Sequence, residues 1–69
     1  MSESCDISVI VPCYNANRYL NICLESLKAQ RVPNIEMIFI DDGSTDSTGA
    51  ILDAFARAES RARVLHVRN

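Results

Sequence analysis

The sequence has few of the residues that mark specialised folds. Only two of its 69 residues are glycines, so it cannot carry the GxGxxG or P-loop patterns of classical dinucleotide oxidoreductases and P-loop NTPases. Its three cysteines, Cys5, Cys13 and Cys23, are odd in number and lack CxxC spacing. This pattern argues against a disulfide framework or a structural metal site, and predicts three reduced thiols.

Long apolar runs and an excess of basic residues are also absent. The longest uninterrupted apolar runs, residues 9–11 and 37–40, fall far short of the ~20 residues that cross a bilayer. Residues 1–6 have neither the basic n-region nor the apolar h-region of a secretory signal, which predicts a cytoplasmic protein. We expect these residues to form a flexible leader. We expect attachment to the inner face of the membrane only through regions outside this segment. A net charge of −2 with scattered basic residues excludes the footprint of a nucleic-acid-binding protein.

The residues that are present suit a small globular unit. A chain that is 48% hydrophobic and 23% charged has the composition of a soluble globular protein. Its length fits one small domain or part of one.

Three apolar runs predict strands. Residues 7–11 are mostly β-branched and end at Pro12, which predicts a strand buried on both faces. Residues 35–40 form a second run that ends sharply at the polar residues 41–44. Residues 63–67 predict a third, shorter strand.

Helical spacing follows each of the first two runs. The apolar positions of the first helix are Leu20, Cys23, Leu24 and Leu27. Those of the second are Ile51, Leu52, Phe55 and Ala58. Asn15 or Asn17 can cap the first helix, and Thr45 or Asp46 can cap the second, which is expected to end near Ser60.

The resulting βαβαβ order predicts an α/β fold with a parallel sheet and right-handed crossovers. Crossovers that step across the sheet in one direction place both helices on one face and leave the other face bare. The bare face must hold one of two alternating sets: Ile10, Ile38 and Ile40, or Val9, Val11, Met37 and Phe39. We expect this face to make the isolated chain self-associate, aggregate or remain partly molten.

The carboxyl ends of the strands are where ligands bind in open α/β sheets, which directs attention to residues 12–15 and 41–46. Asp41 and Asp42 can accept hydrogen bonds from a base N–H or from ribose hydroxyls. The same residues also suit an Asx turn and a helix cap, and both interpretations stay open at this point. Tyr14 can stack on a base and Asn15 can bond a polar edge, although loop aromatics more often cover a core.

His66 falls in the third predicted strand with no partner visible in the sequence. The sequence therefore predicts a packed or solvent-edge histidine in preference to a catalytic one.

These segments together resemble the opening of family 2 glycosyltransferases. The resemblance rests on residues 7–15 (ISVIVPCYN) and 36–46 (EMIFIDDGSTD), with residues 19–20 and 24–30 between them. The strings SVIVPxYN and DDGSTD are among the most recognisable features of that family. The resemblance implies that residues 1–69 are the incomplete N-terminal part of a GT-A, or Rossmann-like, nucleotide-diphospho-sugar transferase domain.

The resemblance also implies roles for five residues. Pro12 and Tyr14 would border the nucleobase, with Tyr14 stacking on uracil, and Asn15 belongs to the same nucleotide-sugar site. Asp42 would bond the base, and Asp41 would support the turn or contact the ribose.

The chain departs from the family pattern at Ala16, where the family usually has an acidic residue, so that contact is not carried over. The family's metal-binding DxD, which holds Mn²⁺ or Mg²⁺ against the diphosphate, lies further along the chain, as do the acceptor-site base and the acceptor-binding region. We therefore expect an inverting transferase that moves a sugar from a UDP-linked donor to a glycan, lipid-linked or other hydroxyl acceptor. This segment would supply no catalytic or metal-binding residue and would be inactive by itself.

A non-catalytic binding module is the alternative function. A receiver-like or other doubly wound domain can chelate a cation with an acidic pair. In a receiver that pair would follow the first strand, which here ends in residues 12–15. The order of the residues therefore favours the transferase.

Overall fold

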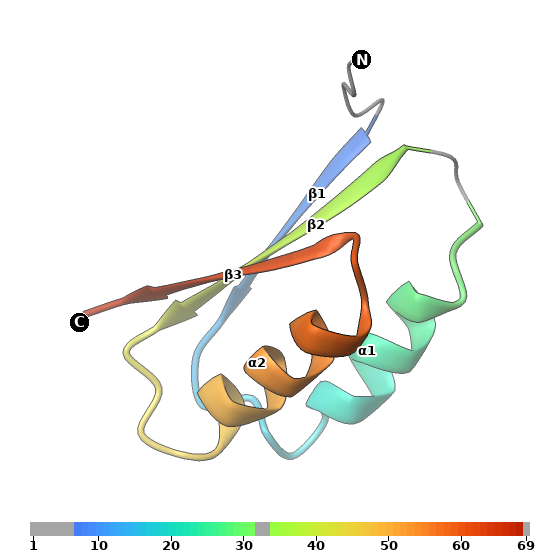
Figure 1. The fold of residues 1–69 in the computed structure, drawn as a ribbon. Helices are drawn as coiled ribbons and strands as arrows, with labels where there is room; N and C mark the ends of the chain where they lie inside the picture. Colours follow the sequence, from blue (N-terminus) through green and yellow to red (C-terminus); the bar gives the residue numbers. More distant parts are fainter. Residues whose placement is uncertain (1–6, 32–33, 69) are drawn as a thin grey trace.

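The computed structural model describes residues 7–31 and 34–68, which form a three-stranded parallel sheet and two helices. The elements along the chain are β1 (Ile7–Cys13), α1 (Leu20–Lys28), β2 (Ile35–Asp42), α2 (Thr48–Ala58) and β3 (Ala62–Val67), as Figure 1 shows. The predicted α/β class and βαβαβ order are confirmed. The predicted leader, residues 1–6 with Cys5, lies outside the described residues, whereas Cys13 and Cys23 are free thiols.

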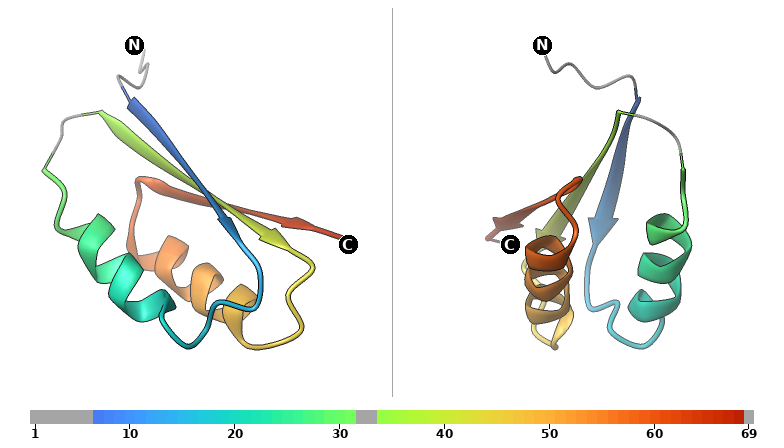
Figure 2. Two further views of the ribbon diagram at one scale, coloured as in Figure 1. Left: turned by 180° about the vertical axis from the view of Figure 1, so that it is seen from behind. Right: turned by 45° about the vertical axis from the view of Figure 1, so that its right-hand side comes forward.

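Both helices lie on the same face of the sheet, whose strand order is β1-β2-β3 (Figure 2). On the central strand β2, Met37 and Phe39 are completely buried beneath the helices. The Phe39 ring packs edge-on against Phe55 of α2, with the ring centroids 5.7 Å apart. The core of the chain therefore lies between the sheet and the two helices.

The opposite face of the sheet carries apolar side chains that are open to solvent. Ile10 is 61% exposed and Leu65 is 54% exposed. The parallel register pairs Ile10 with Ile38, and Ile40 with Leu65, so the first of the two alternating sets points to this open face. The prediction that β1 is buried on both faces is wrong for this chain, because both crossovers run along the same side of the sheet.

The helix starts differ from those predicted. Tyr19 is the N-cap of α1 and Ser47 is the N-cap of α2, and neither side chain makes a capping hydrogen bond. The sequence predicts other caps: Asn15 or Asn17 for α1, and Thr45 or Asp46 for α2. Asp46 lies one residue before the cap, where its Oδ1 accepts the N–H of Thr48 at 2.8 Å. The two asparagines instead bond to the opposite loop.

Within residues 7–31 and 34–68, neither helix has the length and apolar character needed to span a membrane.

Candidate functional site

The carboxyl ends of β1 and β2 lie side by side, because the register pairs Cys13 with Asp41. The loops that follow them, residues 14–19 and 43–47, therefore meet at one edge of the sheet (Figure 1). This edge is where ligands bind in open α/β sheets.

Asn15 ties the two loops together. Its side-chain Oδ1 accepts the N–H of Thr45 at 2.8 Å, and its own N–H donates to the Ser44 hydroxyl at 3.0 Å. The backbone of Asn15 has a φ of 47°, in the left-handed region that asparagine tolerates better than most residues. The side-chain amide of Asn15, predicted from the sequence to contact a ligand, thus holds the opposite loop through its oxygen.

The loop contacts continue toward α1. Asn17 donates its backbone N–H to Asp46 at 3.4 Å and its side-chain amide to the Ser47 hydroxyl at 3.2 Å. Hydrogen bonds between two loops restrict their conformations before any ligand arrives, which lowers the cost of ordering them on binding.

The first carboxylate of the acidic pair is buried. Asp41 is 6% exposed, its Oδ1 accepts the N–H of Ser44 at 3.1 Å, and its Oδ2 lies 2.9 Å from Nδ1 of His66. Hydrogen bonds from Ser44 and then from His66 hold the pKa of Asp41 below its usual value, although burial acts in the opposite direction. Asp41 is therefore an ionised support of the turn.

The second carboxylate is accessible. Asp42 ends β2 as an exposed residue, and strand alternation places it on the open face of the sheet, away from the helices. Pro12 is exposed on the neighbouring strand, where it pairs with Ile40, and Tyr14 is 54% exposed. The predicted site residues thus divide into two that hold the loops, Asn15 and Asp41, and three that face solvent.

The sequence misses the role of His66. Its Nδ1 contacts Asp41 and its Nε2 lies 2.8 Å from Oδ1 of Asp53 on α2. The strand alternation of β3 does indicate which way this side chain points. Because Ala62 is buried and Val64 is half-buried, His66 lies on the same, helix-covered face of the sheet. The partners themselves come from distant parts of the chain, which no local pattern reveals.

The acidic pair does not form a metal site. Asp41 and Asp42 are consecutive residues of one strand, so their side chains point to opposite faces of the sheet. In the part of the chain that the structure describes, no three or more His, Cys, Asp or Glu side chains cluster in a way that could hold a metal ion.

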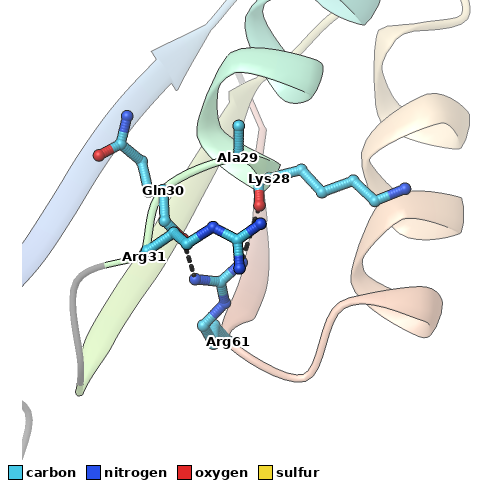
Figure 3. A pocket seen from close by; sticks show the side chains of 5 residues that line it. All are labelled: Lys28, Ala29, Gln30, Arg31 and Arg61. Atoms are coloured by element: carbon cyan, nitrogen blue, oxygen red, sulfur yellow. Dashed lines mark hydrogen bonds between the residues drawn. The ribbon is translucent and has the colours of Figure 1, made fainter.

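A concave pocket of about 460 Å³ lies near the C-terminal end of α1 and is lined by Lys28, Ala29, Gln30, Arg31 and Arg61 (Figure 3). Arg61 donates hydrogen bonds to the backbone carbonyl oxygens of Gln30 at 2.9 Å and Lys28 at 3.3 Å. It also pairs with Glu59 at 2.7 Å. These contacts occupy the Arg61 guanidinium and stabilise the end of α1. The pocket has no lining residue in the polar loops, and we interpret it as a structural junction.

Comparisons with known proteins point to one family. The model of the family described as glycosyl transferase family 2 matches residues 8–69. The chain is 52% identical over 63 residues to the glycosyltransferase GlyG of Streptococcus pneumoniae, an alignment that covers 91% of this chain and 21% of the relative. It is 39% identical over 69 residues to YibD, an uncharacterized glycosyltransferase of Escherichia coli, covering 100% of this chain and 20% of the relative.

A third relative, the teichoic acid poly(glycerol phosphate) polymerase of Staphylococcus epidermidis, is 43% identical over 47 residues, which cover 68% of this chain and 6% of the relative. The chain thus spans about a fifth of the length of GlyG and YibD, and a smaller share of the polymerase.

Proposed function

Because the chain belongs to glycosyl transferase family 2, we propose that it forms the base and ribose end of the nucleotide-sugar donor site of a glycosyltransferase. One observation carries this proposal. At two adjacent strand ends, Asn15 and Asp41 hold the loops, whereas Tyr14 and Asp42 leave a ring and a carboxylate exposed. An exposed ring on a fixed loop and an exposed acceptor at the adjacent strand end suit a uracil base, which offers a flat face and an N–H.

The proposed roles follow from these positions. The Tyr14 ring stacks on the uracil of a UDP-linked donor, and Pro12 borders the same base. Asp42 accepts the N–H of the base. Asp41 is buried and bonded to Ser44, so it acts mainly through the turn that it supports. Asn15 fixes the loop that carries Tyr14.

The proposed reaction is an inverting transfer to a hydroxyl of a glycan or lipid-linked acceptor. The acceptor oxygen forms a bond to the anomeric carbon of the donor sugar as the bond from that carbon to the diphosphate breaks. The acceptor proton passes to a carboxylate base. We propose that this base lies outside the present chain, which is then inactive by itself. A relative named as a teichoic acid polymerase supports an acceptor that is a growing polymer.

We also propose that Mn²⁺ or Mg²⁺ offsets the diphosphate charge in the complete enzyme, with ligands outside the described residues. The proposed location is cytoplasmic, and at the inner face of the membrane if other regions of the enzyme attach it there. Cell fractionation tests this location. The family match lends no support to the alternative of a receiver-like module.

Calorimetric titration of the full-length protein with UDP tests the donor site. Asp42→Asn is expected to weaken UDP binding roughly tenfold to a hundredfold, because a hydrogen bond to a charged group contributes ~1.5–3 kcal/mol. The matched variant Asp41→Asn is expected to weaken binding less, because Asp41 faces the helices and the turn. Equal affinities of the wild-type protein and Asp42→Asn for UDP would contradict this assignment.

A further inference from the structure

His66 lies between two carboxylates that belong to different elements. Its Nδ1 is 2.9 Å from Oδ2 of Asp41 on β2, and its Nε2 is 2.8 Å from Oδ1 of Asp53 on α2. The imidazole of β3 therefore connects the central strand to the helix that covers it. Its side chain is about half exposed, so it can exchange protons with solvent.

Both contacts require the ring nitrogens to act as donors. Ionised carboxylates only accept hydrogen bonds, and a neutral imidazole has a single N–H. The two contacts are satisfied together only when both nitrogens of His66 carry a proton. Consistent with this geometry, the hydrogen bonds to Asp53 and to Asp41 raise the pKa of His66 above its usual value.

The histidine is linked to the proposed donor site through Asp41. The other oxygen of that carboxylate accepts the N–H of Ser44, and the Ser44 hydroxyl accepts the N–H of Asn15. A chain of hydrogen bonds thus runs from the ring to both loops. Asp42, the proposed base contact, lies between Asp41 and the turn.

Gly49 lets the three groups come this close. A Cβ atom at this position of α2 would lie 2.7 Å from Oδ2 of Asp41 and 3.4 Å from Cε1 of His66. Only a residue without a side chain leaves room for the carboxylate and the ring against the helix.

We propose that His66 is a positioning residue for the donor site, and that its doubly protonated ring fixes Asp41 and thereby the turn that presents Asp42. This inference rests on the proposed function of the site. When the ring loses a proton as the pH rises, it loses its positive charge and one of its two N–H donors, so its contact with the Asp41 carboxylate weakens and the turn is held less firmly. The charged groups that act on the ring are Asp41 from β2 and Asp53 from α2. At the end of β1, burial raises the pKa of the Cys13 thiol, and the nearby Cys23 and Asp41 raise it further.

UDP titration of the full-length protein between about pH 5.5 and about pH 8.5 tests the proposal, since an ordinary histidine titrates within this range. The amide of His66→Gln is uncharged at every pH and carries both of its N–H groups on one nitrogen, so it cannot place a donor at both ring-nitrogen positions. We expect the wild-type protein to bind UDP about two- to tenfold more tightly than His66→Gln at the acidic end, and the two affinities to converge at the basic end. Because UDP itself titrates, the ratio of the two affinities is the readout.

Two variants separate a positioning role from a general loss of folding. Asp53→Asn replaces a half-exposed carboxylate with a neutral amide. Without that negative charge the ring should release its proton at lower pH, so the fall in UDP affinity should move to lower pH. Arg63→Gln, on the same strand and paired with Glu36 far from the loops, should leave the pH profile unchanged. Nitrogen-15 NMR of the wild-type ring should show both nitrogens protonated at the acidic end.

The outcomes distinguish the two proposals. If the wild-type protein binds UDP and Asp42→Asn weakens binding, but His66→Gln follows the wild-type pH profile, the positioning role is wrong and the donor site stands. A ring with a single proton at the acidic end also overturns the positioning role. A wild-type protein that does not bind UDP at any pH overturns the donor site and the positioning role together.

Discussion

The backbone N–H of Ala16 donates a 2.8 Å hydrogen bond to the hydroxyl of Thr48, and both residues are buried. This bond joins the loop after β1 to the first turn of α2, across 32 residues of sequence. It lies beneath the contacts that Asn15 and Asn17 make with the opposite loop. The two loops of the proposed donor site are therefore fixed to each other from the interior outward.

The first prediction concerns this buried bond. Thr48→Val keeps the shape of the side chain but removes the acceptor, which leaves the N–H of Ala16 buried without that partner. We expect a loss of ~1–3 kcal/mol in the free energy of unfolding. Denaturant titration measures it. Thr48→Ser, which keeps the hydroxyl and loses one methyl group, should cost only ~0.8 kcal/mol. Equal losses in the two variants would show that packing, and not the hydrogen bond, explains the effect.

The element order and the sheet were predictable because they depend on local apolar runs and on helical periodicity. Short apolar runs specify β1, β2 and β3, and helical spacing specifies α1 and α2. The handedness of the crossovers places both helices on one face. Which alternating set faces the helices was not predictable, because both sets are apolar. The structure selects Met37 and Phe39 for the core, where Phe39 packs on Phe55.

The location of the candidate site was predictable from the sequence, but the roles of its residues were predictable only in part. The polar residues after β1 and β2 had to meet at one edge of a parallel sheet. The helix caps were mispredicted, because Asn15 and Asn17 bond across to the other loop, a contact between residues about 30 positions apart. The link from His66 to Asp41 spans 25 residues and likewise left no local pattern.

The second prediction concerns Gly49. In an ordinary helix interior, replacing glycine with alanine stabilises a protein by ~0.5–1 kcal/mol. Here the new Cβ would lie 2.7 Å from Oδ2 of Asp41, a carboxylate already held by Ser44 and His66. We expect Gly49→Ala to lower the free energy of unfolding and to displace the carboxylate. Thermal unfolding measures the first effect, and a stabilised Gly49→Ala variant would contradict the close approach.

The third prediction is a pH dependence that arises from Glu59. Hydrogen bonds from the side chain and the backbone N–H of Arg61 lower the pKa of Glu59 from 4.5 to about 2. A depressed carboxylate pKa means that the ion pair stabilises the fold above pH ~4.5 and that this contribution is lost as the pH falls toward ~2. The side chains of Arg61 and Glu59 are 29% and 16% exposed, so solvent screens part of this interaction and its contribution to stability is smaller than the pKa shift alone implies.

Glu59→Gln isolates this contribution from those of the other carboxylates. The difference in free energy of unfolding between the wild-type protein and Glu59→Gln should shrink as the pH falls from neutral toward ~2. Denaturant titration at a series of pH values measures it. A difference that stays constant over the whole range would mean that the charge of Glu59 has no part in it.

The fourth prediction concerns the exposed ring at the end of β1. Tyr14→Ala is expected to weaken UDP binding, because stacking of a base on an aromatic ring contributes ~1–3 kcal/mol in single-strand binding proteins. Tyr14→Phe keeps the ring and should bind UDP almost as well as the wild-type protein. Calorimetric titration of the full-length protein compares the three. If phenylalanine weakens binding as much as alanine does, the hydroxyl is the contact group and the stacking role is wrong.

The fifth prediction concerns the open face of the sheet in the isolated 69-residue chain. Parallel sheets are normally covered on both faces, and a core of this size rarely contributes more than ~3–5 kcal/mol. The open face carries the apolar side chains Ile10, Ile38, Ile40, Leu65 and Val67. We therefore expect the isolated chain to self-associate and to bind 1-anilinonaphthalene-8-sulfonate, a dye that reports exposed apolar surface.

Two matched variants locate that surface. Ile10 on β1 and Ile22 on α1 are 61% and 76% exposed, so a lysine at either position removes no buried contact of the core. Ile10→Lys puts a charge on the open face and should reduce both the association seen by analytical ultracentrifugation and the dye fluorescence. Ile22→Lys adds the same charge on the helical side and should change neither, because that residue lies away from the open face. A wild-type chain that is monomeric, dye-silent and sharply melting would mean that the uncovered sheet is stable in water without a second layer.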